Sequence, residues 1–356
     1  MYDRAQVGFP ASRDAGSPLI AGERIAGNGP PFTVLDRYRL TPGGTVSTPD
    51  PGQVQRALDL AHQAFRRGAP TAFARGDILE KAVDLVARDR DELVRLMQME
   101  AGFTASDALG EAKRCMETLR LSAEEARRLA GDVIPIEGAP GQEGRIGFTL
   151  RVPLGIVAAI TPFNSPLNTV AHKIAPALAA GNAVILKPSS ATPFTALKLA
   201  ELFIEAGIPP GFLSVVPGGA AVANLLLEDQ RVRFFAFTGS TEVGRRIQQA
   251  AGLRRTQMEL GSIACTILCD DADLDAALPK VVNAAYRKAG QVCTSIQLLL
   301  VHASIVDEVK TRLATVVAKL PYGDPRNADT VCGPIISEKE AVRIDASVAH
   351  TLTPPR

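Results

Sequence analysis

The chain has 356 residues, of which 46% are hydrophobic and 22% charged, a composition typical of globular proteins. Its 39 basic and 38 acidic residues give a formal charge of +1, so charge gives no reason to expect nucleic acid or an anionic membrane as a partner. The sequence shows no apolar signal segment and no apolar run of membrane-spanning length. We therefore expect a cytoplasmic protein with reduced thiols, no nucleic-acid partner and no membrane partner.

The cysteines and histidines show no spacing typical of a disulfide framework or a metal site. Five cysteines are an odd number, and Cys265 and Cys269 stand four positions apart without a second pair of ligands. The four histidines are scattered along the chain and form no zinc-binding motif. We predict that the protein has no metal site.

The first fifty residues are rich in glycine and proline and predict extended or hairpin structure, with a weak strand over 18–25. Helical periodicity then begins at about residue 51, and Thr48 or Asp50 is a suitable N-cap for that helix.

Two more amphipathic helices are predicted, over 73–102 and 106–131. Gly102 and Gly131 stand at their ends, where glycine commonly forms the C-terminal cap of a helix.

After residue 145 apolar strands alternate with helices. The predicted strands cover 155–162, 183–188, 212–218 and 233–240. The predicted helices cover 166–181, 193–208, 220–229 and 241–252. This alternation implies an α/β fold with a parallel sheet and crossover helices on both faces. A nucleotide cofactor then belongs at the carboxyl ends of the strands. From about residue 257 another strand–helix unit follows, which we expect to belong to a second domain.

Polar side chains stand where several of these strands end. Asn164, Lys187 and Glu259 each follow an apolar run, and residues 237–244 (FTGSTEVG) form a strand, a glycine loop and a helix start. Taken alone, each of these residues is explained equally well without a function, as part of a turn or as a solvated strand end. The glycine loop lacks the lysine of a P-loop, and no GxGxxG motif is present. Cys293 adds a thiol in the loop AGQVCTS, between a predicted helix and a predicted strand. Together these groups comprise a nucleophile, a carboxylate base and an amide donor, as acyl-thioester chemistry requires.

The motifs TPFN, LKPS, EAGIPPG, FTGSTEVG, MELGS and GQVCTS occur in the order and spacing of the aldehyde dehydrogenase superfamily. The chain resembles that superfamily over roughly residues 18 to 345. The resemblance implies a Rossmann-type NAD(P)-binding domain with an N-terminal helical segment over residues 1–256. It also implies an α/β catalytic domain over residues 257–356, incomplete relative to the family.

The resemblance also implies a mechanism. The Cys293 thiolate would attack a small aldehyde, and the Asn164 amide with the Cys293 N–H would hold the oxyanion. Hydride would pass to NAD or NADP, and Glu259 would activate the water that hydrolyses the thioester to a carboxylic acid.

The family pattern further assigns residues to the dinucleotide. They are Ile160, Thr161, Pro162, Lys187, Ser189, Ser190, Gly219, Phe237, Gly239, Ser240, Val243, Gly244 and Leu260. Members that prefer NAD commonly carry glutamate where this chain has Ser190, so NADP is also accommodated, and NAD is slightly favoured. Ser262 replaces a glycine of the family motif.

The C-terminal sequence TLTPPR departs from the family, whose members continue further with a nicotinamide-ribose clamp and the hairpin through which subunits form homo-oligomers. We therefore expect a truncated or frameshifted chain. Two alternatives stay open. One is a catalytically impaired remnant that binds the dinucleotide alone, and the other is a thiol hydrolase that uses Cys293 and Glu259 without hydride transfer.

Overall fold

A computed structural model describes residues 16–352, with side chains as far as residue 350. Its core is a seven-stranded sheet in the order β11-β10-β7-β8-β9-β1-β2. Five of its strands are parallel neighbours: β7 (Ile156–Ile160), β8 (Ala183–Lys187), β9 (Leu213–Val215), β10 (Val232–Thr238) and β11 (Arg255–Glu259). Two short antiparallel strands, β1 (Leu19–Ile20) and β2 (Glu23–Arg24), complete one edge. The predicted parallel α/β sheet is thus confirmed.

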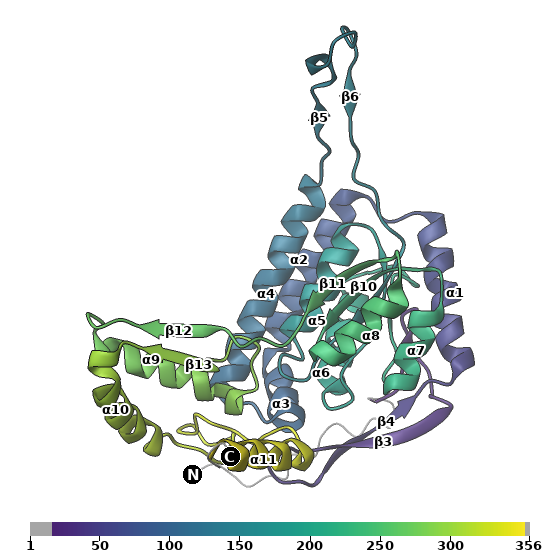
Figure 1. Cartoon of the computed structure of the whole chain (residues 1–356). Coiled ribbons are helices and arrows are strands. Elements are labelled where there is room, and N and C mark those ends of the chain that lie inside the picture. Colours follow the sequence, from purple (N-terminus) through teal and green to yellow (C-terminus); the bar gives the residue numbers. More distant parts are fainter. Residues whose placement is uncertain (1–15, 353–356) are drawn as a thin grey trace.

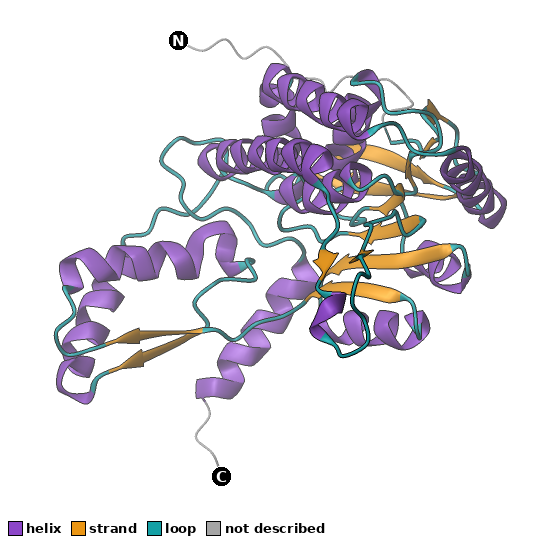
Figure 2. Ribbon diagram, turned by 90° about the horizontal axis from the view of Figure 1, so that it is seen from above, coloured by secondary structure: helices purple, strands orange, loops and turns teal. Residues whose placement is uncertain are grey.

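Helices cover both faces of this sheet (Figures 1 and 2). One layer contains α5 (Asn168–Ala179) and α6 (Pro193–Glu205), and the other contains α1 (Pro51–Arg67), α7 (Ala220–Glu228) and α8 (Thr241–Ala251). Every residue of β7 and of β8 is buried between the two layers. That burial explains why these strands are apolar throughout instead of alternating.

The hairpin of β3 (Gly29–Leu35) and β4 (Pro42–Thr48) precedes α1. The predicted extended lead is therefore confirmed for residues 16–50, whereas residues 1–15 lie outside the described part of the chain. Of the two candidate caps, Thr48 is the last residue of β4, and Asp50 caps α1. Its Oδ1 accepts from the Gln53 N–H at 2.7 Å, and Gln53 Oε1 accepts from the Asp50 N–H at 3.0 Å, which is a capping box.

The single helix predicted over 73–102 is wrong. The structure has two helices, α2 (Ala72–Arg88) and α3 (Arg90–Ala101), which meet at Asp89. The Asp89 carboxylate forms ion pairs with Arg88 and Lys198 there, and α3 then packs against α6. Aspartate is favoured at such a break because it bonds locally in non-helical conformations. The predicted cap at Gly102 is confirmed, with φ of 70°.

The predicted cap at Gly131 is also wrong, because α4 (Ala105–Arg128) ends earlier, at Leu129. A Cβ at Gly131 would lie 1.6 Å from the Thr149 carbonyl oxygen. Glycine is therefore needed here for close approach of two backbones. The chain then enters the protruding hairpin of β5 (Val133–Ile134) and β6 (Gly147–Phe148), with the turn η1 (Ile136–Gly138) between them (Figure 1).

A second, two-stranded parallel sheet is formed by β12 (Cys265–Leu268) and β13 (Leu298–Val301). Helices α9 (Leu274–Tyr286) and α10 (Val306–Ala318) pack on it around a small core of their own. The short turns η2 (Arg287–Gly290) and η3 (Ala303–Ile305) connect these elements, and α11 (Glu338–Leu352) follows. Strand β11 crosses the predicted boundary at 256/257 and belongs to the large sheet. Between residues 16 and 352, no helix is long and apolar enough to cross a membrane.

Candidate active site

The carboxyl ends of four strands meet at one edge of the large sheet. Ile160 at the end of β7 is in register with Lys187 of β8 and with Phe237 of β10, and Thr238 is in register with Glu259 of β11. The chain proceeds from β7 to β8 on one side, whereas β10 lies on the other side of β7. Such a reversal of strand order opens a crevice where α/β proteins bind ligands. Asn164, Lys187, Gly239 and Glu259 all lie at this edge.

The nucleophile candidate sits in a loop with unusual backbone geometry. Lys288, Ala289 and Gly290 have φ of 53°, 55° and 72°. Two successive non-glycine residues in this region are costly, at about 1–2 kcal/mol each, so surrounding contacts must hold them. Gln291 supplies two such contacts, since its Nε2 donates to the Lys288 carbonyl at 3.0 Å and its Oε1 accepts from the Ile336 N–H at 2.9 Å. The loop presents Cys293 exposed.

A buried ion pair fixes this loop against the loop that carries Asn164. Lys288 Nζ donates to Glu111 Oε2 at 2.9 Å and to the Asn164 carbonyl at 3.0 Å, and it lies 3.8 Å from the centroid of the Phe103 ring. Glu111 is fully buried. Its Oε1 accepts from Ser165 Oγ at 3.0 Å and from two backbone N–H groups that follow. Every oxygen of this buried carboxylate is therefore satisfied.

Neither member of this pair was predicted from the sequence. A signal was present for Glu111, which lies on the apolar face of its helix, close to the buried Ala108, Ala112 and Cys115. A charged residue at a position that the helical period places in the core indicates a buried partner. No comparable signal marked Lys288, because its loop has no regular period.

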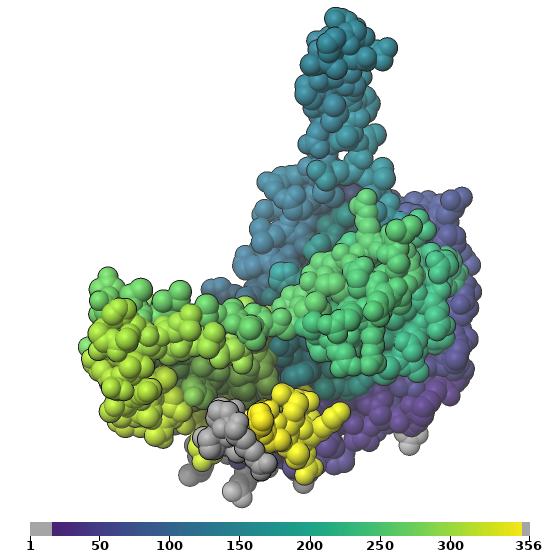
Figure 3. Space-filling view, in the orientation of Figure 1, coloured from purple at the N-terminus to yellow at the C-terminus, as the bar shows by residue number. Residues whose placement is uncertain are grey.

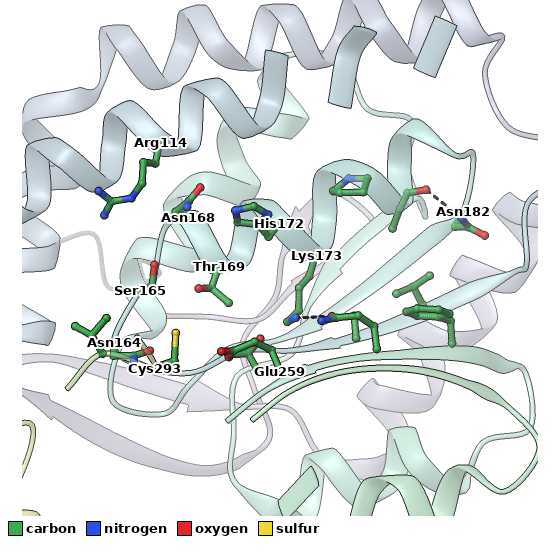
Figure 4. A pocket seen from close by; sticks show the side chains of 18 of the residues that line it. Arg114, Asn164, Ser165, Asn168, Thr169, His172, Lys173, Asn182, Glu259 and Cys293 are labelled. Atoms are coloured by element: carbon green, nitrogen blue, oxygen red, sulfur yellow. Dashed lines mark hydrogen bonds between the residues drawn. The ribbon is translucent and has the colours of Figure 1, made fainter. Parts of the chain in front are cut away.

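Cys293, Glu259 and Asn164 line one cavity of about 800 Å³ (Figure 4). It lies between α5 and strands β7, β10 and β11 of the large sheet, with α4 and the Cys293 loop at its sides; Figure 3 shows the outer face of the molecule around these elements. Partial burial, and then the neighbouring Glu259 carboxylate, raise the pKa of the Cys293 thiol. Asn164 Nδ2 donates to the Gln291 carbonyl at 2.8 Å, which fixes its amide beside the nucleophile loop.

Basic side chains that the sequence did not single out share this cavity. They are Arg114, His172, Lys173, Arg287 and Lys288. Lys173 is buried, its Nζ donates to Gln257 Oε1 at 3.0 Å, and burial lowers its pKa to about 8.

The predicted cofactor residues at the carboxyl ends of β7 and β8 include two buried groups with spare hydrogen-bonding capacity. Lys187 is 9% exposed and its Nζ donates to the Pro188 carbonyl at 3.0 Å, while burial lowers its pKa to about 8. The buried Thr161 Oγ1 has no partner in the described part of the chain. Buried donors without partners are costly, so a polar ligand fits here. Ile160 is buried and Pro162 half-buried beside them.

Ser189 and Ser190 follow Lys187 at the rim of the crevice. Ser189 Oγ accepts from the Ala191 N–H at 3.2 Å, and Ser190 is exposed and donates from Oγ to the Gly218 carbonyl at 3.0 Å.

The remaining cofactor candidates surround the starts of α7 and α8. Gly219 caps α7 and is exposed. Ser240 caps α8, its Oγ accepting from the Val243 N–H at 3.4 Å. An open helix N-terminus of this kind suits a phosphate.

Two glycines in this loop meet large side chains. A Cβ at Gly239 would lie 2.6 Å from the Phe237 ring, and one at Gly244 would lie 2.4 Å from Leu260. The loop therefore depends on glycine to pack closely, as a phosphate-binding turn does.

An α/β crevice with an open helix N-terminus, beside an exposed thiol and a carboxylate, defines the class: a dinucleotide-dependent oxidoreductase. Comparison with known proteins agrees. The model of the aldehyde dehydrogenase family matches residues 25–353, and the chain belongs to this family.

Curated relatives and solved structures resemble most of the chain. A 3-sulfolactaldehyde dehydrogenase from Priestia aryabhattai is 43% identical, covering 90% of this chain and 67% of the relative. An NADP(+)-dependent succinate-semialdehyde dehydrogenase from Escherichia coli is 38% identical, covering 94% and 70%. A crystal structure of betaine aldehyde dehydrogenase from Staphylococcus aureus with NAD+ has a TM-score of 0.90 at 30% identity, covering 94% and 67%. The chain is thus an NAD(P)-dependent aldehyde dehydrogenase that spans about two thirds of its relatives' length.

Proposed function

We propose that the chain oxidises an aldehyde to a carboxylic acid through a covalent intermediate on Cys293. The observation that carries this proposal is the placement of the exposed Cys293 thiol and the Glu259 carboxylate in one cavity, which Asn164 also lines. A thiol with a raised pKa is a weak nucleophile until a base removes its proton. Glu259 is positioned to be that base.

Each residue then has a distinct task. Glu259 takes the thiol proton, and the sulfur attacks the aldehyde carbon. The oxyanion that develops receives hydrogen bonds from Asn164 Nδ2 and from the Cys293 N–H, which is the kind of fixed donor pair that lowers such barriers. When bound, the nicotinamide of the cofactor supplies the hydride acceptor that the oxidation requires. Glu259 then releases the thiol proton to solvent and, as a carboxylate again, accepts a proton from the water that hydrolyses the thioester. The Cys293 sulfur leaves as the thiolate and is reprotonated for the next cycle.

For the dinucleotide, we assign the ribose to the side of Lys187 and Ser189 and the phosphates to the start of α8 at Gly239 and Ser240. The unused donors of Lys187 and Thr161 support the first assignment. The exposed Ser190 carries no charge that would repel a 2′-phosphate and no carboxylate to grip a 2′-hydroxyl. Both NAD and NADP fit, with NAD slightly favoured.

The names of the relatives do not decide the substrate. Sulfolactaldehyde and succinate semialdehyde are anions, whereas betaine aldehyde is a cation. The kind of aldehyde must therefore be inferred from the charged residues that line the cavity.

The direct test is turnover of a panel of aldehydes with NAD and with NADP, followed by the absorbance of the reduced cofactor. Cys293→Ser should abolish turnover, and the control Cys269→Ser, at another exposed cysteine, should leave it unchanged. Equal rates in the wild type and Cys293→Ser would overturn the proposal. Hydrolysis of p-nitrophenyl acetate without any cofactor reduction would favour the thiol hydrolase instead, and NAD(P) binding without turnover would favour the binding remnant.

A further inference from the structure

The cavity that holds the nucleophile is strongly basic. Five of its lining residues are basic and one, Glu259, is acidic. Four of the five, all except His172, carry a positive charge, and two of these four are already engaged. Lys288 is paired with the buried Glu111, and the charge of Lys173 interacts with that of Glu259.

Two guanidinium groups remain without a counter-charge. Neither Arg114 nor Arg287 takes part in an ion pair or a guanidinium hydrogen bond with any residue between 16 and 350. Arg114 is exposed and Arg287 is half-buried, so both guanidinium groups are open to a ligand that enters the cavity. Arginines that line a cavity and whose guanidinium N–H groups have no protein acceptor are suited to bind an anion, because a guanidinium binds oxyanions through two parallel hydrogen bonds.

The position of these groups relative to the nucleophile defines a two-ended site. Arg114 projects from α4, on the wall of the cavity opposite Cys293 and Glu259 (Figure 4). His172 lines the same cavity from α5, and its Nε2 lies 3.4 Å from Thr118 Oγ1. Partial desolvation and the neighbouring Lys173 lower the pKa of His172, so its ring is neutral at pH 7 and can donate one hydrogen bond. Arg114 thus faces the thiol across the cavity, and His172 and Arg287 line the same cavity.

We propose that the substrate is a short aldehyde that carries an anionic group, and that Arg114 and Arg287 hold this anion with help from His172. Carboxylate, sulfonate and phosphonate share the required chemistry: a compact group of oxygens with negative charge. The cavity of about 800 Å³ accommodates such a small molecule. This inference rests on the proposed function, because it orients the aldehyde end of the substrate toward Cys293.

The first experiment compares aldehydes of matched length and different charge. The anion 4-oxobutanoate, its neutral amide 4-oxobutanamide and the cation 4-(trimethylammonio)butanal differ chiefly at the end remote from the aldehyde. We expect kcat/KM for the anion to exceed that for the amide by about tenfold or more, with the cation lowest. Replacing the carboxylate with a sulfonate (3-sulfopropanal) or a phosphonate (2-phosphonoacetaldehyde) shows which anion is preferred.

Variants assign the preference to residues. Arg114→Gln and Arg287→Gln should each reduce the anion-to-amide ratio by about tenfold or more, and Arg114→Lys should restore part of it. Lys113→Gln is the matched control, because it removes the same charge from the neighbouring exposed position of α4, which does not line the cavity. Oxidation of the amide as efficiently as the anion by the wild type, or an equal effect of Lys113→Gln, would overturn the proposal.

A second readout does not depend on turnover. Cys293 can be alkylated with anionic iodoacetate or with neutral iodoacetamide, and the exposed Cys265 serves as the internal reference. We expect the iodoacetate-to-iodoacetamide rate ratio to be higher at Cys293 than at Cys265, and Arg114→Gln should lower it at Cys293 alone. If this ratio is raised while no aldehyde is oxidised, the anion subsite stands and the proposed function fails. If aldehydes are oxidised while the ratio is the same at both thiols, the anion subsite fails and the function stands.

Discussion

Replacing Lys288 with methionine should destabilise the whole site, because this residue connects three elements. Methionine keeps most of the volume but removes the bonds to Glu111 Oε2 and to the Asn164 carbonyl, together with the ring contact to Phe103. It leaves the fully buried Glu111 carboxylate without its cation. The loss of one partner from a buried ion pair costs about 3–5 kcal/mol.

The low end of that range applies here. Three donors still satisfy Glu111 Oε1 after the substitution, so the carboxylate is not left bare. We expect a loss of about 3 kcal/mol in the free energy of unfolding, a large part of the ~5–15 kcal/mol that a domain has. The strained backbone at residues 288 and 289 also loses an anchor, so Cys293 should become less well positioned and turnover should fall.

Urea unfolding followed by circular dichroism measures this, since the chain has no tryptophan for fluorescence. Lys280→Met is the control, a matched substitution at an exposed position of α9. Glu111→Gln added to Lys288→Met should recover part of the loss, because a neutral amide costs less to bury than an unpaired carboxylate. An unfolding midpoint for Lys288→Met equal to that of Lys280→Met would refute the reasoning.

Three further predictions concern the nucleophile and the cofactor crevice. Burial and then the Glu259 carboxylate raise the pKa of Cys293. Glu259→Gln should therefore move the pH midpoint of Cys293 alkylation downward, and the rate of aldehyde oxidation should fall by about 10²–10⁴-fold. An unchanged midpoint would show that the two groups do not interact. Burial lowers the pKa of Lys187 from 10.5 to about 8. Between these two pH values the unfolded chain therefore binds a proton that the folded chain lacks. The free energy of unfolding should then rise with pH by up to about 3 kcal/mol in the wild type relative to Lys187→Met. Parallel pH profiles for the wild type and Lys187→Met would contradict this. Ser190→Glu should reduce kcat/KM with NADP relative to NAD by about tenfold or more, because the new carboxylate would repel a 2′-phosphate; an unchanged ratio would place the ribose elsewhere.

Much of the architecture was predictable from the sequence, because it depends on local periodicity. The strands that form β7, β8, β9 and β10 are buried on both faces, so their apolar runs stand out between amphipathic helices. The failures occurred where local signals compete. Asp89 divides α2 from α3 within a continuous helical pattern. Gly131 has the position of a helix cap, but it is required by the close approach of the backbone at Thr149.

The site was predicted in part for the same reason. Asn164, Glu259 and Cys293 stand at the ends of regular elements, where motifs are readable, and the structure brings all three to one cavity. Glu111 and Arg114 come from α4, more than a hundred residues before Cys293. The packing of that helix on α5 brings Arg114 to the cavity and Glu111 to the loops beside it. Nothing local in a helix reveals which distant loop its side chains will meet.

The measurement that tests the central claim most directly is the mass of the Cys293 peptide during turnover. Glu259→Gln is mixed with NAD(P) and 4-oxobutanoate at a pH above the midpoint of its Cys293 alkylation, so that the thiolate forms without the base, and is then quenched with acid and digested. Because Glu259 is assigned to the hydrolysis of the thioester, this variant should accumulate Cys293 carrying the acyl group of the acid product. Product formation with Cys293 unmodified, or acylation at another cysteine, would contradict the account.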